Sequence, residues 1–112
     1  MLHKVMDKVF KALADATRRT LLDRLRDQQG QTLTQLISAL RMSRQSASRH
    51  IAVLENAGLV VTRWSGREKL HYLNPLPIAE IGSRWIDRFS TDKAQALTHL
   101  KQALEESENG NS

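Results

Sequence analysis

Residues 43–58 read Ser-Arg-Gln-Ser-Ala-Ser-Arg-His-Ile-Ala-Val-Leu-Glu-Asn-Ala-Gly, and this stretch decides the fold. Ser43 is a natural N-cap, and Gly58 is typical of the residue that follows a helix C-terminus, so the stretch predicts a single helix. Its first acidic residue is Glu55. Acidic residues are normally favoured in the first turn of a helix, and a capping box would place one at Ser46. Their absence fits a helix N-terminus that faces phosphate groups.

At about 100° per residue, the predicted helix has two distinct sides. Three apolar residues fall together and are expected to face the core: Ala47, Ile51 and Leu54. The opposite side carries Gln45, Arg49 and Ala52, with Arg44, Ser46 and Ser48 on the flanks. These residue types can read or position duplex DNA: arginine pairs with guanine, glutamine with adenine, serine with phosphate or base, and alanine with the thymine methyl group.

The chain ahead of this stretch predicts three further helices. The spacing of apolar residues predicts helices over 3–14 and 16–28, with Asp15 as the cap of the second and Gly30 as its end. A third, short helix is indicated by apolar residues at i, i+3, i+4 and i+7, which are Leu33, Leu36, Ile37 and Leu40. We expect Thr34 to cap it, Thr32-Leu33 to be a very short strand, and Arg41-Met42 to form the turn into the next helix.

The chain behind the stretch predicts a β-hairpin. Residues 59–64 are rich in β-branched and aromatic residues and predict a strand, Ser65-Gly66 predicts the turn, and 67–73 predicts the partner strand. Arg63 and Arg67 flank the tip, which can lie along the DNA backbone or reach the minor groove. Trp64 packs under the hairpin or lies near a sugar, and we expect packing.

The order of helix, tight turn, basic helix and basic hairpin is typical of a winged helix-turn-helix protein that places one helix in the major groove. We predict a mainly α fold with a small β-hairpin and about five helices. His50 is expected to be half-buried and satisfied by a backbone or phosphate oxygen, not to act as a metal ligand or catalyst. The candidate DNA contacts are Thr34, Ser43, Arg44, Gln45, Ser46, Ser48, Arg49, His50, Arg63 and Arg67.

The charge pattern agrees with a polyanionic partner. The chain has 112 residues, a formal net charge of +5 and a pI of about 10.1. No acid occurs between Gln31 and Leu54, whereas acids gather near both ends. The absence of cysteine excludes disulfides and thiolate metal sites. We find no apolar run long enough to span a membrane and no signal-peptide pattern at the N-terminus, so we expect a cytoplasmic protein.

Helical periodicity resumes at Ile78, either as one helix to about residue 106 or as two helices with a break near residues 90–92. We expect one domain over 1–107 and a flexible tail at 108–112. The terminal helices carry more apolar residues than one small core needs, so a shared two-fold interface is favoured over folding inward within one chain. Its candidate residues are Val5, Val9, Phe10, Ile81, Trp85, Phe89, Leu97 and Leu100.

Five segments, in order, resemble the ArsR/SmtB family of arsenical-resistance repressors. They are residues 10–19 (FKALADATRR), 43–51 (SRQSASRHI), 54–60 (LENAGLV), 66–67 (GR) and 72–75 (YLNP), within a resemblance that spans about residues 5–90. The resemblance implies an α-rich winged helix that forms a homodimer through its first and last helices and represses transcription by occupying an operator. It also implies that Ser43 to His50 enters the major groove and that Arg63 to Arg67 forms the wing.

The chain departs from the metal-sensing members of that family. Those members carry a cysteine pair on the helix before the recognition helix, where this chain has Leu36 to Leu40 without a thiol. Others bind zinc through an Asp-x-His pair in the last helix, whereas here that helix has His99 as its one histidine and no such pair. Zinc needs three or four converging ligands. The resemblance therefore implies a metal-independent member, and we expect no metal and no cofactor.

The residues leave other classes open. A ligand- or metal-responsive sensor repressor could use the same scaffold. A winged-helix module for protein contact would need an apolar recognition face, whereas the predicted one is polar and cationic. An enzyme is the least favoured class, because the sequence shows no nucleophile and base spacing, Gly-rich phosphate loop or paired buried carboxylates.

Overall fold

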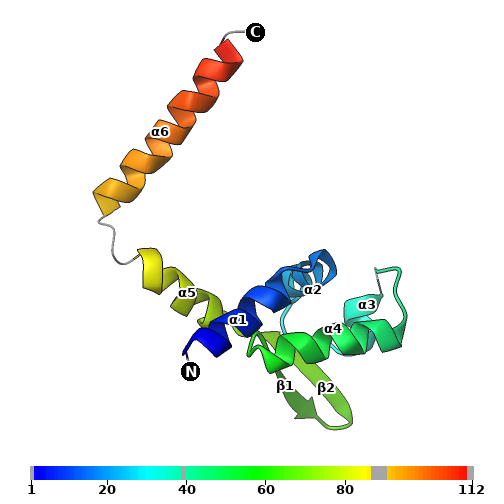
Figure 1. The fold of residues 1–112 in the computed structure, drawn as a ribbon. Helices are drawn as coiled ribbons and strands as arrows, with labels where there is room; N and C mark the ends of the chain where they lie inside the picture. The colour runs from blue at the N-terminus through cyan, green and yellow to red at the C-terminus, as the bar shows by residue number, and fades with distance from the viewer. Residues whose placement is uncertain (1, 39, 87–90, 111–112) are drawn as a thin grey trace. The chain divides into compact units, whose positions relative to one another are not determined.

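The computed structural model describes residues 2–38, 40–86 and 91–110. The chain divides into two compact units, Met1–Ala79 and Glu80–Ser112. The first unit contains the helices and the two-stranded antiparallel sheet that concern the binding surface (Figure 1). The second unit is helical.

Helices α1 (Leu2–Leu13) and α2 (Ala16–Asp27) confirm the two helices predicted for the N-terminal part of the chain. Asp15 caps α2 as predicted, because its Oδ1 accepts a hydrogen bond of 3.1 Å from the backbone N–H of Arg18. The cap satisfies one of the amide groups that a helix N-terminus otherwise leaves without a partner.

Helix α3 (Leu33–Ile37) corrects two predictions about its start. Thr32 and not Thr34 is the N-cap: the Thr32 hydroxyl accepts from the backbone N–H of Gln35 (3.2 Å), and the Gln35 side chain accepts from the N–H of Thr32 (2.9 Å). This reciprocal capping box starts the helix early and draws Thr32 and Leu33 away from the predicted strand. The helix also ends early, at Ile37, and the next helix begins at Arg44, so the two are farther apart in sequence than the predicted Arg41-Met42 turn.

The extended pairing lies one residue before the predicted strand. Gln31 forms an isolated β-bridge with His71, whose backbone N–H donates to the Gln31 carbonyl oxygen (2.8 Å). Gly30, with a φ of +79°, donates its own N–H to the His71 carbonyl oxygen (2.9 Å). Helix α2 ends at Asp27, so Gly30 turns the chain toward the hairpin and does not itself end the helix as we predicted.

Helix α4 (Arg44–Asn56) matches the stretch that predicted it. Ser43 is its N-cap, since the Ser43 hydroxyl accepts from the backbone N–H of Ser46 (3.0 Å). The three residues predicted to face the core are the buried residues of this helix: Ala47, Ile51 and Leu54. We call them the apolar face of α4.

The end of α4 is a Schellman motif. Gly58 has a φ of +78°. Its N–H donates to the carbonyl oxygen of Glu55 (3.0 Å), and the N–H of Leu59 donates to that of Leu54 (2.9 Å). Leu54 and Leu59 are both fully buried, which supplies the apolar contact that accompanies this motif. The motif satisfies the last carbonyls of α4 and sends the chain directly into the first strand.

Strands β1 (Val60–Ser65) and β2 (Glu68–Leu73) form the predicted antiparallel hairpin. The turn lies one residue later than predicted, because Ser65 pairs with Glu68 and the two loop residues are Gly66 and Arg67. Gly66 has a φ of +62°, and a glycine at the first loop position is the preference of a type II′ turn. Arg67 therefore sits at the tip itself.

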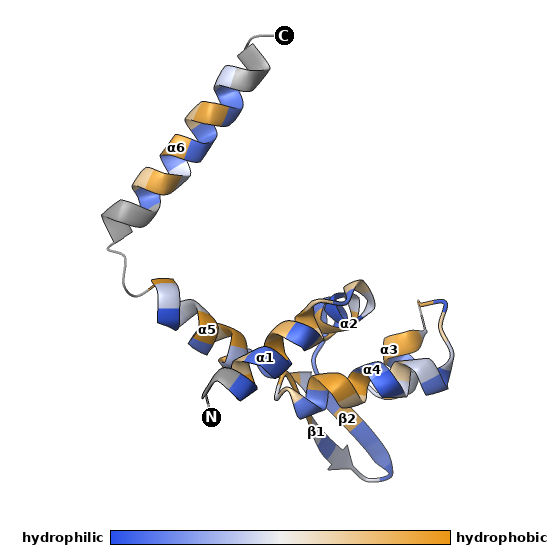
Figure 2. Cartoon of the chain, viewed as in Figure 1, coloured by the Kyte–Doolittle hydropathy of each residue, from blue (hydrophilic) through white to orange (hydrophobic). Residues whose placement is uncertain are grey.

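Helices α5 (Leu76–Ile86) and α6 (Thr91–Gly110) bring the helices among the described residues to six, which agrees with the predicted mainly α fold of about five helices and a small hairpin. The junction that would decide continuity through 90–92 falls partly on residues 87–90, outside the described residues. Helix α6 continues to Gly110, past the expected end near 106, although the sequence indicated fraying from Glu108. Figure 2 shows apolar residues recurring along α6 among polar ones.

The apolar core of the first unit is built by α2 and α4, with further buried residues from α1, α3 and the start of β1. Its fully buried large side chains are Val9, Leu21, Leu25, Leu36, Leu54 and Leu59. Helix α2 contacts α1, α3, α4 and β2, so it lies at the centre of the unit. Burial of each leucine contributes roughly 1.5–3 kcal/mol. The core therefore holds α4 by its apolar face, and the opposite side of the helix faces outward.

The Schellman glycine offers a test of how α4 is joined to the hairpin. An added Cβ at Gly58 would meet Pro77 Cγ at 3.7 Å, an ordinary contact, so the strain of Gly58→Ala comes from the positive φ. We expect Gly58→Ala to lower the free energy of unfolding by about 1–2 kcal/mol. Gly58→Asn should cost less, because asparagine tolerates this conformation. Urea unfolding measures both, and equal losses for the two variants would contradict the conformational explanation.

Candidate nucleic-acid interface

The outward side of α4 is open to solvent. Gln45, Arg49 and Ala52 are exposed, as the helical geometry predicts for residues opposite the apolar face. Arg41, just ahead of the helix, is exposed as well. One cation and an amide donor on the helix, and a second cation just ahead of it, are therefore presented with no acid among them, which suits a surface that meets phosphates and base edges.

An open depression with a volume of about 900 Å³ lies beside α4, between α3 and the hairpin. Helix α4 contributes one flank to it through Arg44, Ser48, Ile51, Ala52 and Glu55. The hairpin contributes Trp64, Arg67, Glu68, Lys69 and His71, and the start of α3 contributes Thr32 to Gln35. The predicted recognition helix and the predicted wing thus border one open depression.

The pairing register decides which wing residues face α4. Side chains alternate between the two faces of a strand, so Val60, Thr62 and Trp64 share one face of β1. Val60 is buried in the core, so this is the face directed inward. Val61 and Arg63 point to the opposite face and are exposed. Arg63 is accordingly absent from the residues that line the depression, whereas Arg67 at the tip is among them.

The charges in the depression are mixed. Arg44, Arg67 and Lys69 contribute positive charge, and Glu55 and Glu68 contribute negative charge. Lys69 Nζ lies 3.9 Å from Glu55 Oε1, an ion pair that links the wing to the C-terminal half of α4. Exposed pairs of this kind contribute about 0–1 kcal/mol to stability. Because the pair is weak, Lys69 can exchange Glu55 for another partner.

The predicted contacts at the start of α4 are already partly engaged. Arg44 Nη1 donates to the Thr34 hydroxyl (2.8 Å), which ties α3 to α4 across the turn. The Ser43 hydroxyl serves as the N-cap. Ser46 is half-buried on the flank that faces away from the wing. The structure brings these residues to one end of α4, beside the exposed Gln45.

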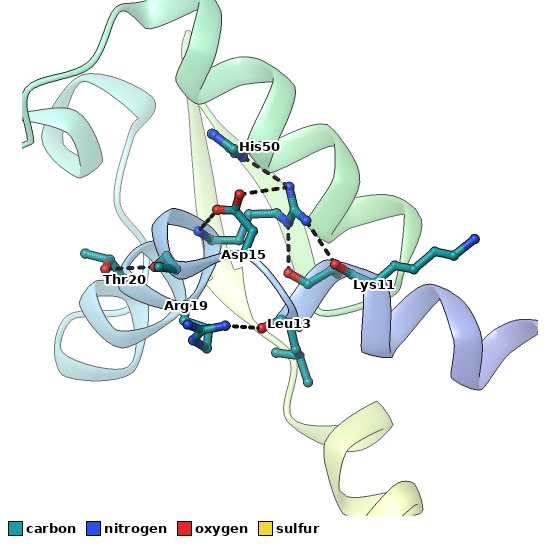
Figure 3. Close-up of polar contacts among 9 residues, drawn as sticks. Lys11, Leu13, Asp15, Arg19, Thr20 and His50 are labelled. Atoms are coloured by element: carbon teal, nitrogen blue, oxygen red, sulfur yellow. Dashed lines mark hydrogen bonds and ion pairs between the residues drawn. The ribbon is translucent and has the colours of Figure 1, made fainter.

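Arg18 is a feature of this surface that the sequence did not indicate. Its Nε donates to the carbonyl oxygen of Ala12 (2.8 Å) and its Nη2 to that of Lys11 (2.9 Å), so one guanidinium holds the C-terminus of α1 (Figure 3). Its Nη1 lies 3.3 Å from His50 Nδ1 on α4 and 3.9 Å from Asp15 Oδ2. A single side chain from α2 therefore connects α1, the cap of α2 and the recognition helix.

His50 is half-buried as expected, but its partner is the Arg18 guanidinium and not an oxygen. A guanidinium can only donate, so in this hydrogen bond His50 Nδ1 is the acceptor. The pKa of Asp15 lies below its ordinary value of 3.8, first because its carboxylate accepts from the backbone N–H of Arg18 and also because of the Arg18 charge. These contacts occupy the flank of α4 away from the wing.

Trp64 contradicts the expectation that it packs under the hairpin: its side chain is 69% exposed. The buried part of the hairpin ends at Val60 and His71, and no hairpin residue nearer the tip is buried. Counting alternate residues outward from the buried Val60 would have placed Trp64 on the α4 side. The sequence alone did not reveal where the core ends.

The candidate dimer residues have different environments. Val9 is 1% exposed and belongs to the core of its own chain, whereas its neighbours Val5 and Phe10 are about half exposed. Ile81 is half-buried and Trp85 is 49% exposed. Leu97 and Leu100 are exposed on α6, and Phe89 lies outside the described residues.

The described residues contain neither a metal-binding cluster nor a membrane-spanning helix. Within them, no group of three or more His, Asp or Glu side chains is placed to hold a metal ion. Across the same part of the chain, no helix combines the length and the apolar character needed to cross a bilayer.

A helix held by its apolar face, a short helix ahead of it and a hairpin beside it define the class of winged helix-turn-helix proteins. Comparison with known proteins agrees. A family model described as a helix-turn-helix domain matches residues 13–63. The HTH-type transcriptional regulator YuzN of Bacillus subtilis, itself uncharacterized, is 36% identical over 87 residues, covering 72% of this chain and 95% of the relative.

Solved structures share this fold. An ArsR-like transcriptional regulator from Rhodococcus sp. RHA1 is 28% identical with a TM-score of 0.67, over 90% of this chain and 93% of that one. A homodimeric winged helix-turn-helix DNA-binding domain from Mycobacterium bovis shares the fold, with 24% identity, a TM-score of 0.65 and coverage of 90% and 86%. The chain belongs to the HTH-type transcriptional regulators, which are DNA-binding proteins, and the solved structures that it resembles include ArsR-family regulators.

The Arg18 contacts provide a test of how the recognition helix is held. Arg18→Ala removes two bonds to carbonyls of α1 and the link to His50, from a side chain that is 17% exposed. We expect it to lower the free energy of unfolding by about 2 kcal/mol. Arg19→Ala is the matched control: Arg19 is exposed and donates one bond, to the Leu13 carbonyl (2.7 Å), so it should cost less than about 0.5 kcal/mol. Thermal unfolding that ranks Arg19→Ala as equally damaging would contradict the role of Arg18.

Proposed function

We propose that the chain is a sequence-specific repressor that binds double-stranded DNA as a homodimer on an inverted-repeat operator. The observation that carries the proposal is the exposed, acid-free side of α4 beside an open depression that the wing borders. A helix of this kind fits the major groove, and the wing then meets the adjacent backbone or minor groove. Repression follows from occupancy, because RNA polymerase is excluded while the operator is covered.

The contacts divide by role. Gln45, Ser48 and Arg49 choose bases, because they lie on the exposed and wing-side parts of α4. Arginines, hydroxyls and the helix N-terminus hold phosphates, and these contacts supply affinity that falls as salt rises. We assign this second role to Thr34, Ser43, Arg44, Ser46, His50, Arg63 and Arg67. Arg67 is the stronger wing contact of the two, because Arg63 faces away from α4.

Selection of bound duplexes from a random pool tests the proposal. We expect recovery of one sequence with two inverted half-sites whose centres are about 34 Å apart, one turn of the duplex. Binding to that sequence should weaken steeply with salt. Recovery of no enriched sequence, or equal binding to all duplexes, would refute the proposal of a sequence-specific regulator.

Arg49 is the sharpest single test of base reading. Arg49→Ala should cost about 1–3 kcal/mol of binding free energy and relax the preference at one base pair in each half-site. Arg26→Ala removes the same charge from an exposed position on α2, where Arg26 is paired with Asp23 (3.5 Å), and should leave the preference unchanged. Titration of the selected duplex and of its single-base variants measures both. A uniform loss across all sequences would make Arg49 a phosphate contact instead.

The homodimer is proposed from the apolar residues that the terminal helices expose. On α6, Leu97, Leu100 and Leu104 recur at i, i+3 and i+7 and are 57–59% exposed, so they form one apolar stripe. A stripe of this kind is normally covered in solution. We propose that it, with Val5, Phe10, Ile81, Trp85 and Phe89, lies in a two-fold interface, so that the terminal helices belong functionally to one domain over 1–107. The M. bovis domain of the same fold is homodimeric.

Charge placed on the stripe tests the dimer. Leu100→Glu should shift the protein from dimer to monomer at micromolar concentration, because a buried unpaired carboxylate costs several kcal/mol in each of two copies. Gln102→Glu adds the same charge on the opposite side of α6 and should leave the dimer intact. Sedimentation velocity of the two variants measures the oligomeric state. A Leu100→Glu variant that remains a dimer would show that the α6 stripe is not in the interface.

We further propose that the protein acts in the cytoplasm, by binding and not by catalysis, and without a metal ion. The chain contains no cysteine, which removes the thiolate ligands that soft metals prefer. The runner-up is a ligand- or metal-responsive repressor on this scaffold. Metal analysis of the purified protein, with and without added zinc, tests the metal-responsive version of that alternative. Bound zinc that changes the affinity for the duplex would favour it over a metal-independent repressor.

A further inference from the structure

Trp64 lies in the binding depression and has no role in the contacts assigned above. The indole is 69% exposed, in a chain that contains only two tryptophans. An exposed indole gains little of the free energy that burial of such a large apolar side chain would provide. Its exposure therefore indicates a surface that is covered when a partner binds.

The position of Trp64 is fixed by the hairpin. It pairs across the strands with Lys69, which reaches Glu55 of α4 at 3.9 Å, so both side chains lie on the α4 side of the sheet. Trp64 lines the depression together with Ser48 and Ala52 of α4. Any molecule that fills the space between the recognition helix and the wing meets the indole.

The surroundings of Trp64 define the chemistry of that molecule. Arg67 is on the adjoining tip and Arg44 lies across the depression; with Lys69 these cations outnumber Glu55 and Glu68, so the depression favours an anionic partner. The indole itself favours a flat apolar surface. A nucleic-acid backbone offers both within a few ångströms, because the apolar face of each deoxyribose lies between two phosphates. An acidic peptide would supply the charge without that regular apolar surface.

We propose that Trp64 is a DNA-contacting residue whose indole packs against deoxyribose of the duplex held by α4. The inference rests on the proposed function and adds to it a contact that carries no charge and reads no base. Trp64 should therefore contribute to affinity without changing the salt dependence of binding, which reports neutralised phosphates. It should also contribute equally for every sequence, because all nucleotides share the sugar.

Fluorescence tests the contact directly. In a Trp85→Phe variant, Trp64 is the single tryptophan of the chain. Addition of the duplex recovered by selection should shift its emission to shorter wavelength or quench it, and salt that releases the duplex should reverse the change. Sedimentation of the variant first establishes that it keeps the oligomeric state of the natural sequence. Emission that stays constant while the duplex binds would overturn the proposal.

Binding measurements give the second test. Trp64→Ala should weaken binding of the selected duplex about tenfold, the effect of losing roughly 60 Å² of apolar contact, with an unchanged salt slope. Arg67→Ala should instead lower the slope by about 1. Val61→Ala is the matched control, because Val61 is a 48% exposed apolar residue on the same strand that faces away from α4, and it should bind like the natural sequence.

The outcomes separate the inference from the proposed function. If selection with the unmutated protein recovers no duplex, the proposed function itself is refuted. If the duplex binds but Trp64→Ala retains full affinity, or loses the dimer, only the role of Trp64 is refuted. A changed salt slope for Trp64→Ala would also refute it, since the variant would then have disturbed phosphate contacts. Circular dichroism and thermal unfolding confirm that each variant is folded.

Discussion

Burial of the apolar face of α4 is the constraint on which the rest of the surface depends. Ala47, Ile51 and Leu54 are held at 4% exposure or less against a core centred on α2. A rotation of α4 by one residue, about 100°, would expose this face and bury polar groups without partners. Burial of the apolar face therefore directs the opposite side of α4, which carries Gln45 and Arg49, toward solvent.

Two further sets of contacts fix the position of α4 relative to its neighbours. The Schellman motif at Gly58 joins the helix end to β1 without a flexible linker, so the wing is fixed relative to the helix. Arg18 holds the opposite flank by joining α1 and α2 to His50. A recognition surface needs such support, because a rigid scaffold positions contacts more accurately than a loop. The wing flank stays open, and this is where the depression forms.

The local signals in the sequence predicted local structure well. The N-caps Asp15 and Ser43, the glycine after α4 and the angular positions on α4 were all confirmed, because each depends on residues within one or two turns. The start of α3 was predicted wrongly, although the deciding signal was local: Thr32 and Gln35 form a capping box that competes with Thr34. The hairpin turn was misplaced by one residue because Ser65-Gly66 and Gly66-Arg67 are both plausible loops, and pairing with the rest of the sheet decides between them.

Periodicity and capping residues were enough to predict where most helices and the hairpin lie and which side of α4 faces outward, because helical periodicity follows from covalent geometry and neighbouring residues. The packing of the elements was needed to see that Arg18 reaches His50, that Val9 lies in the core, that Arg63 faces away from α4, and that Trp64 is exposed in the depression. These facts depend on where the shared core ends and on contacts between segments tens of residues apart. No periodicity within one segment encodes that boundary, because it is set by how the packed elements fill space together.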